Sequence, residues 1–226
     1  MSDPSHNRSL ARFIDHTLLA PTATEAAIRN LCREALEFHF RAVCVSGCWL
    51  GVAREMLQGS GVGLAAVVGF PHGNSSTPAK CREAEACLGD GAGELDMVVN
   101  IGWLKSGAPE KVAEELRQLR AIAPKAVLKL ILETCYLNEE EKRLACRLAL
   151  ESGWDFVKTS TGFGPAGATV EDVLLMKEIA GETMQVKASG GIRDTQTART
   201  FLQAGATRIG TSSGPAIVKG DNPEPL

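Results

Sequence analysis

Three lysines lie inside apolar, strand-like segments and are equally spaced along the chain. They are Lys129, Lys158 and Lys187. Their spacing matches one strand–helix–strand crossover, which predicts one lysine on each of three successive strands. Because lysine is rarely buried without a partner, the pattern indicates a shared interior site at which an amine takes part in chemistry.

Lys158 is the candidate nucleophile, and a loop rich in glycine and hydroxyl residues follows it at 159–164. An amine attacks a carbonyl only when it is neutral, whereas an ordinary lysine has a pKa near 10.4. Burial and a second ammonium group both favour the neutral form, and Lys187 on the next strand would supply that charge. A pKa lowered by about three units, or roughly 4 kcal/mol, would make Lys158 a Schiff-base lysine. The alternative is a strand-end lysine with its ammonium group in water.

Asp96 lies in an apolar strand candidate, where a carboxylate is costly unless it is paired. In a site it could move protons to and from a substrate hydroxyl. A structural ion pair with Lys129 is the alternative. Asp15 and Thr17 would bring a further carboxylate and hydroxyl to the same site, although Asp15 could instead cap a helix or turn.

Turns rich in glycine and serine follow the late strand candidates and predict an anion site. Their N–H groups can close on an anion, helped by the helix N-terminus that follows. The turns after the last two strands of a barrel often bind phosphate. The expected phosphate contacts are Thr161, Gly162, Gly190, Gly191, Gly210, Ser212 and Ser213. Arg193 could assist, or could be a surface residue where a helix begins.

The histidines and cysteines carry less information. His16 and His72 could lie near the mouth of the site, although a structural role is favoured for His16. Cys44 could support the site, although its apolar neighbours favour core packing. The seven cysteines form no CxxC pair, which predicts reduced thiols in a cytoplasmic protein without a structural zinc site.

Size and composition favour one soluble domain over 1–226, with a polar segment at 1–9 and a short tail at 219–226. The formal charge of −3 and the lack of a basic stripe disfavour a nucleic-acid or membrane partner. We expect neither a signal peptide nor a membrane span, because residues 1–9 are polar and the apolar runs are short.

Strand and helix candidates alternate along almost the whole chain. The strand candidates are 13–16, 42–46, 64–70, 95–100, 127–132, 156–159, 185–189 and 208–211. Capping boxes are predicted at 22–25 and 138–141, and Asp194 is expected to cap a helix over 195–204. The segment 110–122 places apolar residues on one face and charges on the other, as a surface helix does.

Eight alternations predict an α/β fold, a single parallel (β/α)8 TIM barrel with an eight-stranded sheet. A doubly wound open sheet is the rival, but 17–21 after the first strand is no glycine-rich dinucleotide turn. In a barrel the site lies at the C-terminal ends of the strands, where the lysines and aspartates fall. Strands about 4.8 Å apart would let these side chains meet.

The chain resembles the deoxyribose-phosphate aldolases, a family of class I aldolases, over residues 13–218. Two motifs are specific in combination: Lys158-Thr-Ser-Thr-Gly162 and Lys187-Ala-Ser-Gly-Gly-Ile-Arg193. Further matching segments are 14–18, 42–45, 69–71, 73–74, 94–98, 100–102, 129–133 and 208–213.

The resemblance implies reversible cleavage of 2-deoxy-D-ribose 5-phosphate to acetaldehyde and D-glyceraldehyde 3-phosphate, in deoxyribose phosphate catabolism. It implies that Lys158 forms the imine, that Lys187 perturbs it, and that Asp96 donates and accepts protons. It implies no cofactor and no metal, phosphosugar and aldehyde substrates, and a homodimer.

Three positions depart from the family pattern. His72 stands where an apolar residue is expected, Phe163 replaces a lysine found in some members, and Pro215 precedes the tail 221–226. Loss of the cation at 163 would leave more of the phosphate binding to backbone and serines. Two other functions stay open: a Schiff-base aldolase for another phosphosugar, and a silent barrel that only binds sugar phosphates.

Overall fold

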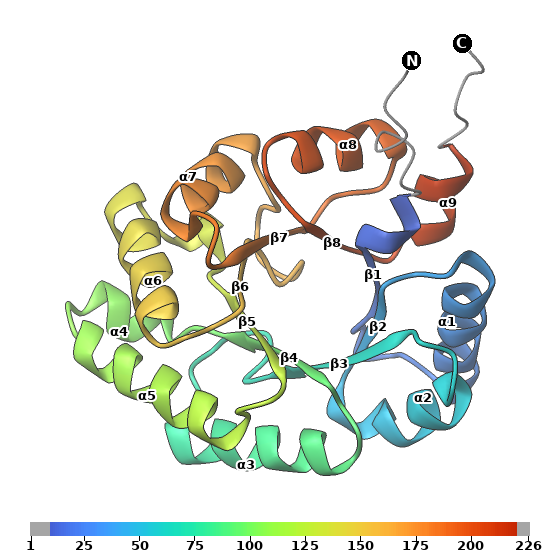
Figure 1. Ribbon diagram of the computed structural model, residues 1–226. Coiled ribbons are helices and arrows are strands. Elements are labelled where there is room, and N and C mark those ends of the chain that lie inside the picture. Colours follow the sequence, from blue (N-terminus) through green and yellow to red (C-terminus); the bar gives the residue numbers. More distant parts are fainter. Residues whose placement is uncertain (1–9, 221–226) are drawn as a thin grey trace.

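A closed barrel of parallel strands forms the centre of the molecule, and its strands follow one another in chain order (Figure 1). The computed structural model describes residues 10–220. The strands are β1 (Ile14–Leu18), β2 (Ala42–Val45), β3 (Gly63–Val68), β4 (Glu94–Val98), β5 (Val127–Ile131), β6 (Phe156–Lys158), β7 (Gln185–Ser189) and β8 (Arg208–Thr211). The predicted (β/α)8 barrel is confirmed.

Helices surround the barrel as an outer ring (Figure 1). They are α1 (Glu25–Phe38), α2 (Leu50–Leu57), α3 (Thr77–Gly89), α4 (Ile101–Lys105), α5 (Pro109–Ile122), α6 (Glu139–Glu151), α7 (Val170–Ala180), α8 (Thr195–Gln203) and α9 (Gly214–Lys219). Short 3-10 turns occupy Leu10–Phe13, Gly47–Trp49 and Thr134–Tyr136. Within residues 10–220, no helix is both long enough and apolar enough to span a membrane. The segment 1–9 and most of the predicted tail lie outside the described residues.

Two of the three predicted helix starts are confirmed, and one is wrong. Asn138 and Glu141 form the capping box of α6, and the Asp194 side chain accepts a hydrogen bond from the Thr197 N–H of α8. The start of α1 is displaced from the predicted box, because Thr24 has the extended conformation of an N-cap and accepts from the Ala27 N–H.

The main apolar core lies between the barrel wall and the helices, as alternation along the strands requires. A smaller apolar group is formed by Cys44, Ala65 and Val67, with Leu19 and Phe70 packed against it. Other side chains in the barrel are charged and buried. The barrel is therefore filled partly by hydrocarbon and partly by a polar network.

A buried ion pair, Lys80 with Glu115, joins α3 to α5 outside the barrel. The Lys80 ammonium donates to Glu115 Oε1 at 2.6 Å and to the Val98 carbonyl at the end of β4 at 2.9 Å. The segment 110–122 is helical as predicted, but Glu115 lies on its buried side with Val112 and Leu116. A carboxylate is tolerated there because Lys80 and the Thr77 hydroxyl supply donors.

Candidate active site

Asp96 on β4 is the point at which the three lysines meet. Its Oδ1 accepts from Lys129 Nζ at 2.7 Å, and its Oδ2 accepts from Lys158 Nζ and Lys187 Nζ, each at 2.8 Å. Strand register explains the convergence, since Asp96 is paired with Lys129 and Lys158 with Lys187. The structure thus brings these four predicted residues into one buried group.

Asp15 on β1 and Glu94 on β4 extend this group. Lys187 pairs with Asp15, and Lys129 pairs with Glu94 at 2.6 Å. Arg208 on β8, which no sequence motif marked as a site residue, bridges both carboxylates, with 2.6 Å to each. The charged cluster is hereafter the set Asp15, Glu94, Asp96, Lys129, Lys158, Lys187 and Arg208.

The balance of charge in the cluster favours one neutral amine. Four basic side chains face three carboxylates, so full protonation leaves an excess of one positive charge inside the barrel. Lys129 and Lys187 each contact two carboxylates, whereas Lys158 contacts Asp96 alone and shares its oxygen with Lys187. Lys158 is therefore the amine that loses its proton with the least electrostatic cost.

The pKa shifts follow the same division. Burial is the largest cause that lowers the pKa of Lys158, and the positive charge of Lys187 lowers it further against the opposing charge of Asp96. For Lys187, burial also lowers the pKa, but Asp15 and Asp96 outweigh it and the net shift is upward. Lys187 therefore stays protonated. The pKa of Lys158 is lowered, as predicted. Desolvation lowers it more than the neighbouring ammonium group of Lys187 does.

Asp15 and Asp96 stay ionised. Burial alone would raise the pKa of Asp15, but Lys187 and Arg208 outweigh it and bring the value to about 2. Burial opposes ionisation of Asp96 in the same way, and the three lysines around it hold its pKa well below the usual range.

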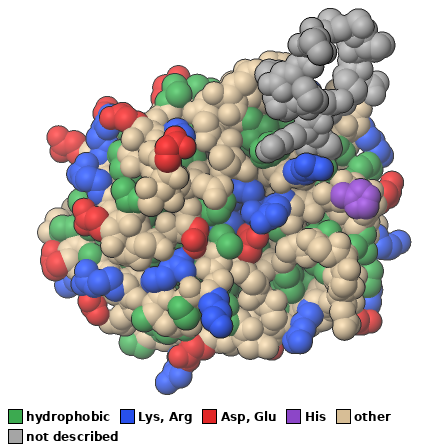
Figure 2. All heavy atoms as spheres, viewed as in Figure 1, with side chains coloured by type: hydrophobic (Ala, Val, Ile, Leu, Met, Phe, Trp, Pro, Cys, Tyr) green, Lys and Arg blue, Asp and Glu red, His purple; other side chains and the backbone are tan. Residues whose placement is uncertain are grey.

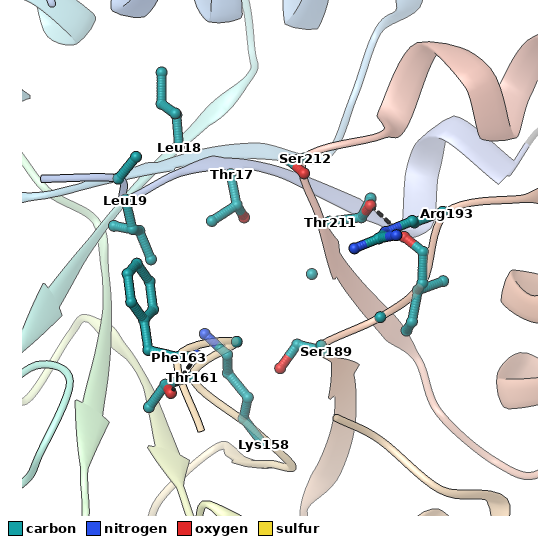
Figure 3. Close-up of a pocket in the computed structure, with 16 residues that line it drawn as sticks. Thr17, Leu18, Leu19, Lys158, Thr161, Phe163, Ser189, Arg193, Thr211 and Ser212 are labelled. Carbon is teal, nitrogen blue, oxygen red and sulfur yellow. Dashed lines mark hydrogen bonds between the residues drawn. The ribbon is translucent and has the colours of Figure 1, made fainter. Parts of the chain in front are cut away.

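A cavity of about 310 Å³ opens above the cluster, and Lys158 is the cluster member that lines it among the described residues (Figure 3). Figure 2 shows Lys and Arg side chains near the centre of the face seen down the barrel. Lys158 extends into the cavity between the wall that carries Phe163 and the wall that carries Ser189 (Figure 3). The cavity is lined by Thr17, Leu18, Leu19, Ala20, Lys158, Thr161, Gly162, Phe163, Ser189, Gly190, Gly191, Ile192, Arg193, Gly210, Thr211 and Ser212.

One wall of the cavity is suited to an anion. Gly190 and Gly191 have φ of 90° and 83°, a left-handed conformation that favours glycine. A Cβ on Gly190 would also lie 2.8 Å from the Gly167 Cα. With Arg193 and Ser212 the wall combines exposed backbone, a guanidinium group and a hydroxyl. These are the donors that a phosphate group requires.

Comparison with known proteins identifies the family. Residues 10–220 match the model described as DeoC/LacD family aldolase. The chain is 52% identical over 215 residues to the deoxyribose-phosphate aldolase of Carboxydothermus hydrogenoformans, covering 93% of this chain and 94% of the relative. The corresponding protein of Brevibacillus brevis is 50% identical over 212 residues, covering 94% of this chain and 96% of the relative.

The chain belongs to the DeoC/LacD aldolase family. A solved structure, the tetrameric deoxyribose phosphate aldolase of Aeropyrum pernix, superposes with a TM-score of 0.87 at 37% identity and covers 93% of this chain and 89% of its own. The fold and the family assignment agree, and the protein is an aldolase, a lyase of carbon–carbon bonds.

Within this DeoC/LacD aldolase, most of the predicted phosphate residues line the cavity, but Ser213 does not. Thr161, Gly162, Gly190, Gly191, Gly210 and Ser212 form part of the wall. Ser213 is instead the residue before α9, and its N–H donates to Thr211 Oγ1 at 2.9 Å. Ser213 therefore takes part in the turn after β8 and does not line the cavity.

The remaining predicted residues divide between site and core. Thr17 lines the cavity, and its hydroxyl donates to the Asp15 carbonyl. Cys44 is fully buried in the small apolar group, and burial raises the pKa of its thiol, which fits core packing. His16 is buried against Glu34 on α1, with 2.6 Å between Nε2 and Oε2, and His72 is exposed on the turn after β3. All seven cysteines are free.

Glu133 is a site residue that sequence reasoning missed. It follows β5 with φ 53° and ψ 63°, is 2% exposed, and accepts from the N–H and the hydroxyl of Thr161. The available signals were its place after the lysine-bearing strand and its position at the end of the family-like segment 129–133. Phe163 lies two residues after Thr161 in the loop that follows β6 and is half-exposed. Its ring packs edge-on against that of Phe70, with ring centroids 5.3 Å apart.

Proposed function

We propose that this aldolase reversibly cleaves 2-deoxy-D-ribose 5-phosphate to acetaldehyde and D-glyceraldehyde 3-phosphate through an imine on Lys158. The observation that carries the proposal is a buried amine of lowered pKa at the base of a cavity with an anion-binding wall. The relatives named deoxyribose-phosphate aldolase at about half identity support the substrate.

Lys158 begins the reaction. Its neutral amine attacks C1 of the open-chain aldehyde, water leaves, and a protonated imine results. As the proton of the C3 hydroxyl is removed, the C2–C3 bond breaks and its electrons move into the imine. Glyceraldehyde 3-phosphate leaves, and the remaining enamine is protonated at C2. Hydrolysis then releases acetaldehyde and restores the amine.

Asp96 and Lys187 serve the proton transfers. Asp96 accepts the C3 hydroxyl proton through a water, and the Lys187 ammonium group that it contacts stays protonated beside it. Lys187 keeps its proton because Asp15 holds it from the other side. This ammonium group also lowers the pKa of Lys158.

The anion-binding wall positions the substrate. Gly190, Gly191, Arg193 and Ser212 would hold the phosphate group, and Lys158 lies across the cavity at the aldehyde end. Fixing both ends converts the attack on C1 into an effectively intramolecular step, which contributes greatly to rate. Phe163 supplies no charge, so Arg193 is the basic side chain that lines the cavity besides Lys158 among the described residues.

Borohydride reduction in the presence of acetaldehyde tests the mechanism. A stable two-carbon adduct that peptide mapping places on Lys158 supports the imine. Absence of an adduct with retained phosphate-sugar binding would support the silent barrel instead. Coupled detection of glyceraldehyde 3-phosphate from deoxyribose 5-phosphate tests the substrate, and an adduct without this product would indicate another aldehyde.

The place of the enzyme in deoxyribose phosphate catabolism, its cytoplasmic location and its homodimeric state are part of the same proposal. Seven free thiols suit a reducing compartment. Sedimentation velocity would test the homodimer, and a tetramer like the relative from Aeropyrum pernix would contradict it.

A further inference from the structure

The loop between β6 and α7 touches the turn after β7 at both of its ends. At its beginning, the Ser189 N–H donates to Thr159 Oγ1 at 3.0 Å, and the Ser189 hydroxyl donates to the Ser160 carbonyl at 2.6 Å. At its end, the Ala168 N–H donates to the Gly190 carbonyl at 3.2 Å. The loop that leaves the reactive lysine therefore returns to hold the anion-binding wall.

Gly167 lies where the loop and the turn approach most closely, with its backbone against that of Gly190. A Cβ on Gly167 would overlap the Gly190 carbonyl group, and a Cβ on Gly190 would lie 2.8 Å from the Gly167 Cα. Gly190 has a φ of 90°, whereas the φ of Gly167 lies outside the left-handed region. Close contact, rather than backbone conformation, is therefore the reason why position 167 requires glycine.

The peptide group between Gly190 and Gly191 has a defined orientation. Its carbonyl oxygen meets Gly167 and Ala168, which do not line the cavity, so this oxygen points away from the cavity. The carbonyl and the N–H of a trans peptide group point in opposite directions. The Gly191 N–H is therefore directed toward the cavity, which Gly191 lines. The contact with Gly167 and Ala168 thus fixes one hydrogen-bond donor of the anion-binding wall.

We propose that Gly167 is a positioning residue for phosphate binding, because its lack of a side chain lets the loop after β6 close on Gly190. This inference rests on the proposed function. A side chain at position 167 would push the Gly190 carbonyl from its place behind the turn and allow the peptide group to rotate. Rotation would turn the Gly191 N–H away and bring a carbonyl oxygen, an acceptor, toward the phosphate group.

The effect should be confined to the phosphate end of the substrate. Lys158 is held inside the barrel by Asp96 at 2.8 Å, whereas a Cβ at position 167 would first meet atoms of Gly190. Imine formation depends on Lys158, and phosphate binding depends on the anion-binding wall. A defect in positioning should therefore separate these two properties, whereas general damage to the barrel should lower both.

The test compares ligands with and without a phosphate group. Inorganic phosphate would be titrated by phosphorus NMR, and the coupled assay would give KM and kcat for deoxyribose 5-phosphate. The rate of borohydride-trapped adduct formation with acetaldehyde would report on Lys158. Gly167→Ala should weaken phosphate binding and raise KM by about tenfold or more, the range of one hydrogen bond to a charged group. The rate of adduct formation and kcat should change far less.

A second variant keeps the test valid if Gly167→Ala does not fold. Ala168→Pro has no N–H to donate to the Gly190 carbonyl and leaves position 167 unchanged, so it should show the same separation. Gly51→Ala is the matched control, because Gly51 lies on α2 and a Cβ there has no neighbour outside its helix within 4 Å among residues 10–220. It should leave phosphate binding and adduct formation unchanged.

Equal losses of phosphate binding and adduct formation in both variants, or loss of the folded state in both by circular dichroism, would show a merely structural role and overturn the inference. Unchanged phosphate binding in a folded variant of either kind would overturn it as well. Failure of the proposed function is distinguishable, because wild-type enzyme would then not cleave deoxyribose 5-phosphate, whereas the phosphate titration does not depend on turnover.

Discussion

Lys158 and Lys187 share one oxygen, since both ammonium nitrogens lie 2.8 Å from Asp96 Oδ2. The two residues are register partners on β6 and β7, so their side chains start from the same level of the barrel. Lys187 has a second carboxylate, Asp15, and Lys158 does not. This asymmetry assigns the neutral amine to Lys158 and the permanent charge to Lys187.

Replacing Lys158 by alanine should abolish cleavage and leave the fold intact. The side chain lies at the base of the cavity, and its removal also relieves the excess positive charge of the cluster. Coupled release of glyceraldehyde 3-phosphate would measure activity, and circular dichroism would check the fold. Substantial residual turnover would remove Lys158 from the proposed role.

Activity should rise with pH through the lowered pKa of Lys158, because the amine reacts only when it has lost its proton. Below that pKa the ammonium form accumulates and kcat/KM falls. In Lys187→Met the neighbouring charge is lost while Asp15 and Asp96 remain, so the pKa of Lys158 should increase. The acid limb of the kcat/KM profile should therefore move to higher pH.

A buried lysine outside the cluster provides the control for this shift. Lys80→Met removes an ammonium group of similar burial from another part of the molecule and should leave the acid limb in place. An acid limb that stays fixed, or moves to lower pH, in Lys187→Met would contradict the assignment of Lys187.

Neighbouring serines should differ in their effect on phosphate binding. Ser212 lines the cavity and Ser213 does not. Ser212→Ala should raise KM for deoxyribose 5-phosphate a few fold, and Arg193→Ala by about tenfold or more, the loss expected for a charge-assisted contact. Ser213→Ala should have little effect. A larger KM change in Ser213→Ala than in Ser212→Ala would contradict this placement of the phosphate group.

The Lys80–Glu115 pair should be costly to break and cheap to replace. Lys80→Met leaves a fully buried carboxylate without its cation and should cost about 3–5 kcal/mol of unfolding free energy. The double variant Lys80→Met, Glu115→Leu removes both charges and should recover much of that loss. Urea unfolding would measure both, and a double variant less stable than the single one would contradict the prediction.

Periodicity was sufficient to predict the barrel, because alternating strands and helices have few compact arrangements. It also placed Asp96 and the three lysines together, since the C-terminal ends of parallel strands converge. Glycine-rich turns after β7 and β8 were recognisable for the same reason. These inferences depend on local residue patterns and on the order of the elements along the chain, and both are properties of the sequence itself.

Partner geometry could not be predicted in this way. Which lysine has one carboxylate and which has two depends on strand register and side-chain direction around the closed sheet. The roles of Arg208 and Glu133, and the exclusion of Ser213 from the cavity, depend on contacts between segments distant in sequence or on the direction of one turn. A hydrogen bond is lost within about an ångström of displacement. Only the tertiary structure therefore distinguishes a lysine that stays charged from one that is reactive.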